Sequence, residues 1–218
     1  MRKTGFSLLT LAVILFSFQS SFAGDMKKET ASLLEKLKTG GYVIYMRHPH
    51  TDKSTKDTDK KNLKNCATQR NLSEKGKEVA KKIGTAVKAL KVSFETVQTS
   101  EFCRAREVPA LMGLEKSETT ASLNHSGGLA KEEAAKRAEF LKKAFASKPK
   151  SNLLLIGHSP NIRDVSLDLI SEGFKPADML VIKAKEGEPG YELVGRVTPK
   201  NWLEWTTPSA ETTSSVKK

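Results

Sequence analysis

The chain has little cysteine and little histidine, and it has no long uninterrupted apolar run. Its 218 residues include two cysteines and four histidines. The main apolar stretch, residues 6–18, is interrupted by Ser and Thr and is too short for a membrane span, so we expect no stable membrane anchor. No cysteine lies near its end, which argues against a lipid-modified N-terminus. The sequence also lacks an internal repeat and a second apolar domain, which leaves one domain with a substantial core.

Residues 1–23 have the organisation of a secretory signal peptide. Arg2 and Lys3 give a basic start, residues 6–18 give the apolar region, and residues 21–23 give an A-x-A-like cleavage site. We therefore expect a cleaved signal and a periplasmic or secreted protein. A retained membrane anchor is the alternative for this segment.

Basic residues outnumber acidic ones, with 37 Lys and Arg against 25 Asp and Glu and a formal net charge of +12. This excess favours an anionic partner, such as a phosphorylated small molecule, lipopolysaccharide, a phospholipid surface or nucleic acid. A Lys-rich solvated surface explains the same numbers, because 28% charged residues is only slightly above average. Charge alone does not name the ligand.

Short apolar runs rich in β-formers alternate with amphipathic helical segments over residues 24–205, which we expect to form the folded domain. The runs at 42–47 and 153–157 are typical of buried parallel strands. The alternation predicts an α/β fold, a three-layer sandwich with a mostly parallel central sheet flanked by helices. Residues 206–218 are rich in Ser, Thr and Lys, and we expect a disordered tail there.

Two of the four histidines, His48 and His158, lie where a predicted strand ends. In an open α/β sheet the carboxyl ends of the strands converge on the ligand crevice. Arg47 precedes the first histidine, and Arg104 lies at the start of a predicted short helix. Guanidinium groups suit phosphate oxygens, and a neutral imidazole can attack phosphorus to form a covalent phosphohistidine. These residues predict an anion site that also carries chemistry.

These motifs stand in the order found in the histidine phosphatase (phosphoglycerate mutase-like) superfamily, which the chain resembles. They are an Arg-His at the end of the first strand, a Ser-x-x-x-Arg-Ala helix start at 100–105 and a late Gly-His-Ser at 157–159. Residues 66–73, followed by Gly76, resemble the loop and helix start of small bacterial members. The resemblance spans roughly residues 42–182 and points to a small exported member of the family.

The resemblance implies a role for each matching residue. His48 would be the nucleophile, and Arg47, Arg104 and His158 would form the phosphate pocket. Such an enzyme needs no metal and no other cofactor. Arg70 is a further candidate for binding the phosphate from its loop, with an exposed salt bridge as the alternative. Asn161 is another candidate for phosphate or substrate binding.

The sequence departs from the family pattern in two places. The usual Arg-His-Gly or Arg-His-Ala becomes Arg-His-Pro-His, and Pro49 stiffens the exit from the strand. Mutase-like members carry a glutamate after a Leu-Asn pair, whereas His125 follows that pair here. A protonated His125 could donate to the leaving oxygen, or it could be an ordinary loop histidine. Asp52 and Glu107 are the other candidates for the general acid.

The two cysteines, Cys66 and Cys103, form an even pair in a chain that we expect to be exported. An oxidising compartment favours one disulfide between them, and two free buried thiols are the alternative. A disulfide would tie the loop after the first strand to the segment that carries Arg104.

Two other functions compete with a phosphatase. Residues 48–52 have the H-x-H-x-D spacing of a metal hydrolase, although the further histidine of such sites is replaced by Lys53. A non-catalytic phosphate- or anion-binding module with the same pocket is the other alternative. The sequence favours an exported, metal-independent phosphatase of the histidine acid phosphatase type. Its substrate would be a small phosphorylated molecule, with the cell envelope as one source, and not nucleic acid.

Overall fold

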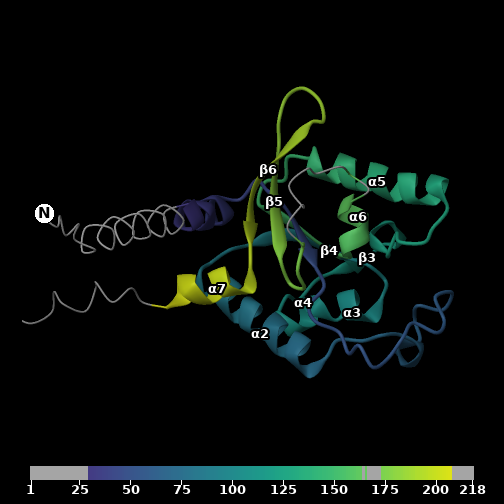
Figure 1. Cartoon of the computed structure of the whole chain (residues 1–218). Coiled ribbons are helices and arrows are strands. Elements are labelled where there is room, and N and C mark those ends of the chain that lie inside the picture. Colours follow the sequence, from purple (N-terminus) through teal and green to yellow (C-terminus); the bar gives the residue numbers. More distant parts are fainter. Residues whose placement is uncertain (1–28, 164, 166–172, 208–218) are drawn as a thin grey trace, which may run out of the picture.

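The computed structural model describes residues 29–163, 165 and 173–207 (Figure 1). Their centre is a six-stranded mixed sheet in the order β3-β2-β4-β1-β5-β6. The pairs β1–β4, β2–β4 and β2–β3 are parallel, and β1–β5 and β5–β6 are antiparallel. The expected mostly parallel sheet is confirmed. The strands are β1 (Val43–Arg47), β2 (Phe94–Thr99), β3 (Glu118–Thr119), β4 (Asn152–Gly157), β5 (Met179–Ala184) and β6 (Tyr191–Val197).

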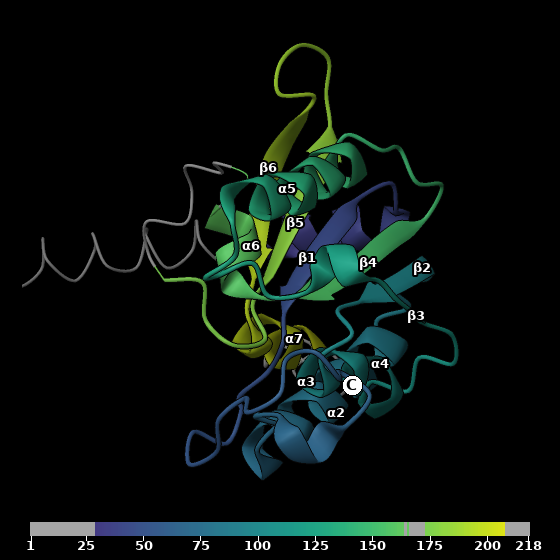
Figure 2. The same ribbon diagram turned by 90° about the vertical axis from the view of Figure 1, so that its right-hand side faces the viewer.

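Helices cover both faces of the sheet. Helices α5 and α6 lie on one face, and α2, α3, α4 and α7 lie on the other (Figure 2). The expected three-layer arrangement is therefore confirmed. The helices are α2 (Glu74–Ala89), α3 (Cys103–Arg106), α4 (Val108–Leu111), α5 (Lys131–Phe145), α6 (Ser159–Arg163) and α7 (Pro199–Thr206), with short 3-10 helices η1 (Cys66–Thr68) and η2 (Ala121–Leu123). Residues 29–39 are also helical.

Each face of the sheet has its own hydrophobic core. Ile44 and Met46 of β1 belong to the cluster under α2, while Val43 and Tyr45 belong to the cluster under α5. Successive side chains of a strand point to opposite faces, so a strand covered on both sides needs a continuous apolar run. This double burial explains why the segment that leads to His48 is apolar throughout.

The start of α2 is fixed against the chain that leaves β1. Ser73 caps the helix by accepting a hydrogen bond from the Gly76 amide, and its own amide donates to the His50 carbonyl at 3.0 Å. A Cβ at position 76 would lie 2.0 Å from that carbonyl oxygen, so only glycine allows this close approach. The contact holds the exit of β1, and therefore His48, in one place.

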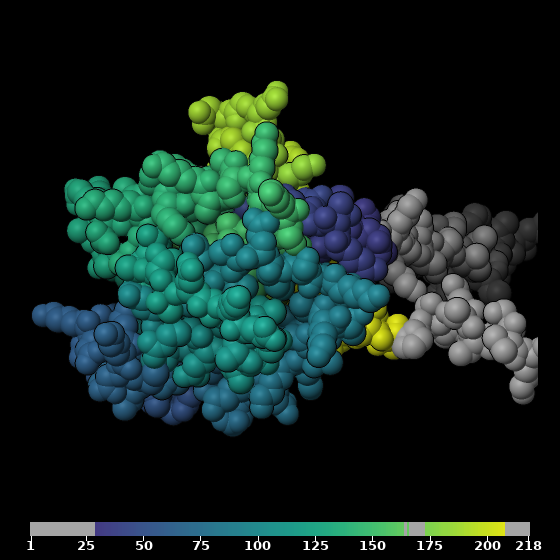
Figure 3. All heavy atoms as spheres, turned by 180° about the vertical axis from the view of Figure 1, so that it is seen from behind, coloured from purple at the N-terminus to yellow at the C-terminus, as the bar shows by residue number. Residues whose placement is uncertain are grey.

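The hairpin that joins β5 and β6 protrudes from the body of the molecule (Figures 1 and 3). Because β5 runs antiparallel to β1, the turn of this hairpin lies at the amino end of β1 and not at the carboxyl ends of β1 and β4. The candidate site and the hairpin are thus at opposite ends of the strands.

The predictions for the two ends of the chain concern mainly residues that lie outside the described ranges. The expected signal peptide, residues 1–23, lies outside the described residues. Of the expected tail, residue 206 is the last residue of α7, and residues 208–218 lie outside the described residues. In the part of the chain that the structure describes, no helix is both long and apolar enough to cross a membrane.

Candidate active site

The structure brings His48 and His158 together at the carboxyl ends of two neighbouring strands. β1 and β4 are parallel and Arg47 pairs with Gly157, so the two histidines follow paired positions. The His48 amide donates to the Gly157 carbonyl at 3.0 Å, and the ring centroids are 5.1 Å apart. The Tyr45 hydroxyl donates to the His158 carbonyl and accepts from the His158 amide, both at 2.9 Å. The backbone therefore fixes both rings relative to each other.

The hydrogen bonding of His48 determines which of its nitrogens is free to react. Its Nδ1 lies 2.8 Å from the Pro49 carbonyl oxygen. A carbonyl can only accept, so Nδ1 carries the hydrogen and the lone pair of the neutral ring is on Nε2. Burial lowers the pKa of His48 to about 3, and the nearby Arg104 and Arg47 act in the same direction. His48 is therefore neutral at ordinary pH, as a nucleophile must be.

His158 is buried on the other side of the site. Its Nε2 lies 2.9 Å from the Ser100 hydroxyl oxygen, and its Nδ1 has no hydrogen-bond partner among the described residues. Burial lowers the pKa of His158 well below its ordinary value, and His48 and Arg104 lower it further. The protein thus keeps a second neutral imidazole within a few ångströms of the first.

Arginines bring positive charge to the same place. Arg104 is 1% exposed, and its guanidinium lies over the Phe102 ring at 4.3 Å. Arg47 donates to the Phe174 carbonyl. Among the described residues, the Nε atoms of Arg47, Arg70 and Arg104 are buried without a hydrogen-bond partner. A buried donor without a partner costs about 1–3 kcal/mol, so this group of donors marks a place built for an anion.

An aspartate that the sequence did not single out lies on Arg104. The Asp57 carboxylate accepts from the Arg104 guanidinium and from the Arg70 amide, both at 2.9 Å. Although burial acts to raise the pKa of Asp57, these two bonds hold it below the usual value, so the carboxylate is ionised. Asp57 therefore balances the buried charge of Arg104 from within the long polar loop after β1.

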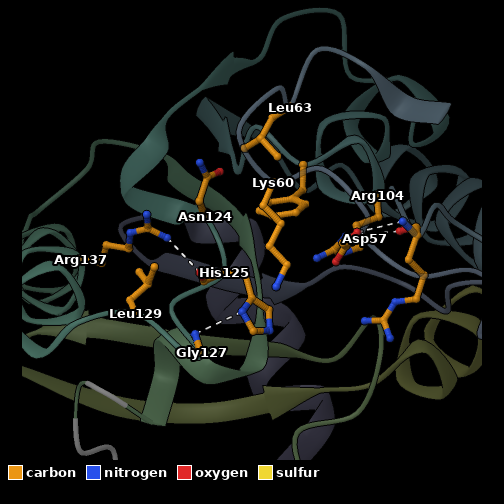
Figure 4. Close-up of a pocket in the computed structure, with 12 residues that line it drawn as sticks. Asp57, Lys60, Leu63, Arg104, Asn124, His125, Gly127, Leu129 and Arg137 are labelled. Atoms are coloured by element: carbon orange, nitrogen blue, oxygen red, sulfur yellow. Dashed lines mark hydrogen bonds and ion pairs between the residues drawn. The ribbon is translucent and has the colours of Figure 1, made fainter. Parts of the chain in front are cut away.

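A pocket of about 250 Å³ opens between Arg104 and His125, and His48, His158 and Arg47 are not among its lining residues (Figure 4). Arg104, Asp57 and Arg70 line one side of it, and His125 and Arg137 line the other. Figure 4 shows the Lys60 side chain extending toward the His125 imidazole. Phe102, Leu63 and Leu129 add apolar surface. The pocket can hold a small organic group, with most of its charged lining residues basic.

His125 faces this pocket from the segment after η2. Its Nδ1 accepts a hydrogen bond from the Gly127 amide at 3.1 Å, so the hydrogen of the neutral ring is on Nε2. The Arg137 guanidinium holds the His125 carbonyl at 3.0 Å, and the ring centroid lies 5.4 Å from that of His158. Burial, followed by Arg104 and Lys60, lowers the pKa of His125.

Two other candidates from the sequence, Asn161 and Asp52, do not line the pocket. The Asn161 amide donates to the Asn124 carbonyl at 2.8 Å, and its oxygen accepts from the Ser126 amide. Asn161 therefore holds the segment that carries His125 and is not among the residues that line the pocket, and its contact with substrate stays a prediction. The Asp52 carboxylate is bonded to Ser54, away from the pocket lining.

The expected disulfide between Cys66 and Cys103 is confirmed. It joins η1 to the first residue of α3, next to Arg104. The Gln69 side chain adds a second link, because its oxygen accepts from the Cys103 amide at 2.9 Å. The loop that carries Asp57 and Arg70 is thus attached to the helix that carries Arg104.

Replacing both cysteines with serine is expected to lower the free energy of unfolding by about 4 kcal/mol, the chain-entropy value for a loop of this size. Urea unfolding of the oxidised protein and of the double variant measures the difference. The unaltered protein in the presence of reductant is the control, and its unfolding midpoint should approach that of the variant. Equal midpoints for the oxidised protein and the variant would show that the cross-link does not constrain the unfolded chain.

The residues of the H-x-H-x-D segment do not gather as metal ligands. Nδ1 of His48 is bonded to the Pro49 carbonyl, and the Asp52 carboxylate is bonded to Ser54. Within the described ranges, the one group of three ligand-type residues close enough for a metal is Cys66, Cys103 and Glu107. Both of its cysteines are in the disulfide, so these residues do not fit a metal either.

No protein-family model matches the chain, and no curated protein sequence matches it. Solved structures with a similar fold include phosphoserine phosphatase from Entamoeba histolytica in complex with 3-phosphoglyceric acid. It has a TM-score of 0.55 and 13% identity, over 74% of this chain and 99% of that one. The mycobacterial glucosyl-3-phosphoglycerate phosphatase has a TM-score of 0.51 and 15% identity, over 70% and 96%. The chain therefore shares the fold of these phosphatases, which is the fold that its motifs led us to expect.

Proposed function

We propose that this chain is an exported, metal-independent phosphatase that hydrolyses a small phosphomonoester through a phosphohistidine on His48. The observation that carries this proposal is the state of His48. Its lone pair is on Nε2, its ring is neutral, and the positive charges of Arg104 and Arg47, each with an unpartnered Nε donor, act on it. This arrangement combines a nucleophile with an electrostatic cradle for the group that it attacks.

The reaction proceeds in two displacements. Nε2 of His48 forms a bond to phosphorus while the bond between phosphorus and the ester oxygen breaks, and the leaving alcohol takes up a proton. Water then attacks the phosphorus of the phosphohistidine, the P–N bond breaks, and inorganic phosphate leaves with the lone pair restored on Nε2. Arg47, Arg70 and Arg104 stabilise the negative charge on the phosphoryl oxygens in both steps.

His125 is the group that fits the proton donor of the first step. It lines the pocket, and Nε2 is its hydrogen-bearing nitrogen. Asp57 is ionised and already accepts two hydrogen bonds, so it has no proton to give. A lowered pKa of His125 means that its acidic, charged form becomes populated as the pH falls. His48 stays neutral down to about pH 3, so both groups are in the required state wherever His125 is charged above that pH.

His125→Gln is expected to slow hydrolysis of an alkyl phosphate such as glycerol phosphate about 100-fold, because the amide cannot supply a proton. Hydrolysis of para-nitrophenyl phosphate should change little, because nitrophenolate leaves without protonation. The rise in alkyl phosphate hydrolysis at acidic pH should also disappear in the variant. The measurement is kcat for both substrates across the acidic range.

His50→Gln is the control, because it makes the same substitution at a histidine that follows β1 and does not line the pocket. It should leave both rates unchanged. An equal loss of both activities in His125→Gln would assign this residue to binding or folding and not to proton transfer.

The direct test of the function is hydrolysis of para-nitrophenyl phosphate by the purified protein in the presence of EDTA. Activity that persists there supports a metal-independent phosphatase. One observation favours the alternative of a non-catalytic anion-binding module, namely that His125 follows the Leu-Asn pair where mutase-like enzymes carry glutamate. Anion binding with no hydrolysis of aryl or alkyl phosphates would support that alternative.

The basic pocket and the signal-like N-terminus fit a substrate released from the cell envelope. Lys60 and Arg137 would face the organic part of such a molecule, because both line the pocket beyond the phosphate cradle. The rates of hydrolysis of phosphorylated sugars and of simple aryl phosphates, measured side by side, test this substrate class.

A further inference from the structure

A chain of hydrogen bonds runs behind His158 and begins at Glu101. The Glu101 amide donates to the side-chain oxygen of Asn124 at 2.8 Å, and the Asn124 side-chain nitrogen donates to the Glu101 carboxylate at 2.7 Å. A backbone amide only donates and a carboxylate only accepts. The orientation of the Asn124 amide is therefore fixed at both of its ends.

This orientation determines where the Ser100 hydrogen lies. The Ser100 hydroxyl is 2.8 Å from the Asn124 side-chain oxygen, which can only accept, so Ser100 donates its single hydrogen there. The Ser100 oxygen then accepts from the Phe102 amide at 3.2 Å and from Nε2 of His158 at 2.9 Å. Nε2 of His158 must carry a hydrogen, and the lone pair of the neutral ring is on Nδ1.

Nδ1 is the nitrogen that remains for an anion between the two histidines. It is buried and has no hydrogen-bond partner among the described residues, whereas Nε2 is directed back to Ser100. A bare lone pair repels a phosphate oxygen, and a protonated nitrogen donates to it. A neutral His158 is therefore the wrong partner for a fully ionised phosphoryl group.

The groups that act most on His158 do not stabilise a charged ring. A bound anion would stabilise it. Those that carry or can take up positive charge are His48 after β1, Arg104 of α3, His125 after η2 and Arg137 of α5. The Phe102 ring packs against His158 at 5.3 Å without adding charge. Every charged neighbour of the ring thus opposes its protonation in the empty site.

We propose that an anion binds between His48 and His158 together with one proton, which Nδ1 of His158 takes up. The site would bind a dianion only with this added proton, or a monoanion that brings its own hydrogen to Nδ1. The proposal rests on the proposed function for the position of the phosphoryl group. Glu101, Asn124 and Ser100 then act as positioning residues, because they fix the tautomer of His158 without touching the anion.

Sulfate is the sharpest probe, because it is a dianion with no proton of its own at ordinary pH. Binding coupled to one proton weakens by about tenfold for each pH unit above neutrality. Isothermal titration of the purified protein with sulfate, in buffers of different ionisation enthalpy, should also show uptake of about one proton per site. A sulfate affinity that does not change between about pH 6 and pH 8, or no sulfate binding at acidic pH, would overturn the proposal.

Four variants assign the proton to His158. In His158→Gln the side-chain amide donates without protonation, so the pH dependence of sulfate binding should disappear. In Ser100→Ala the ring can move its hydrogen to Nδ1, so the pH dependence should weaken, whereas Ser122→Ala in the nearby η2 should keep it. Asp57→Asn removes the titrating carboxylate on Arg104 and should also keep the dependence. Full pH dependence in His158→Gln, or its loss in Asp57→Asn, would place the proton elsewhere.

A measurement on the unaltered protein covers the case in which a variant fails to fold. Nitrogen-15 NMR of labelled histidine should show His158 with its hydrogen on Nε2 in the free protein and on both nitrogens with sulfate bound. A hydrogen on Nδ1 in the free protein would overturn the proposal. Proton-coupled sulfate binding without any hydrolysis would leave this proposal standing and remove the phosphatase, and hydrolysis with pH-independent sulfate binding would do the reverse.

Discussion

Hydrolysis of para-nitrophenyl phosphate should fall by roughly 10⁴- to 10⁶-fold in His48→Ala, the loss expected when a covalent nucleophile is removed. Alanine leaves no lone pair at the position of Nε2 of His48, and Nε2 of His158 cannot replace it because it is bonded to Ser100. The measurement is kcat in EDTA, with mass spectrometry of acid-sensitive phosphohistidine in the unaltered protein.

Two controls separate this loss from a failure to fold. His48→Ala should keep the thermal unfolding temperature of a folded domain and should still bind inorganic phosphate, because Arg47 and Arg104 remain. His50→Gln, two residues along the chain, should keep normal activity. Residual activity in His48→Ala close to that of the unaltered protein would place the nucleophile on another residue.

Arg104→Ala should lower kcat by about 10³-fold, which is typical of losing one strong donor to a transition state. The guanidinium is buried against Phe102 and reaches the pocket with an unpartnered Nε, so water cannot replace it easily. Arg104→Lys should recover only part of the rate, because an ammonium cannot donate from a planar fork. The measurement is kcat and KM for para-nitrophenyl phosphate with each variant.

Arg106→Ala is the matched control for this prediction. Arg106 belongs to the same helix, but its guanidinium contacts the sulfur atoms of Cys66 and Cys103 and does not line the pocket. Its removal should leave kcat nearly unchanged. Because Arg104→Ala also leaves Asp57 without its partner, Asp57→Asn combined with Arg104→Ala separates lost stability from lost catalysis. Normal kcat in Arg104→Ala would contradict its role.

The central sheet and its two histidines were predictable because burial leaves a strong pattern in sequence. β1 and β4 are covered on both faces, which requires unbroken apolar runs, and each run ends at a histidine. The cysteine pair was predictable from its even count and the expected compartment. The direction of β5 and β6 was not, because an apolar run does not show which way its strand points.

The remaining parts of the site depend on contacts that no local pattern shows. Asp57 lies in a loop rich in Asp, Lys and Thr, where nothing in the sequence distinguishes it from Asp52 or Asp59. Its position depends on long-range bonds such as the one from the Thr58 amide to the Thr68 carbonyl. Asn161 was a candidate for substrate binding, and its bonds to Asn124 and Ser126 could not be predicted from the sequence. Only the packing of α6 under residues 123–126 shows that it supports His125.

The Tyr45 hydroxyl, bonded to both backbone groups of His158, links residues 113 positions apart in the chain. Pairings of such high contact order close large loops and form late and slowly relative to local helices. An intermediate in which α2 is complete but β4 has not joined β1 holds His48 without His158. The proposed activity therefore requires the completed sheet.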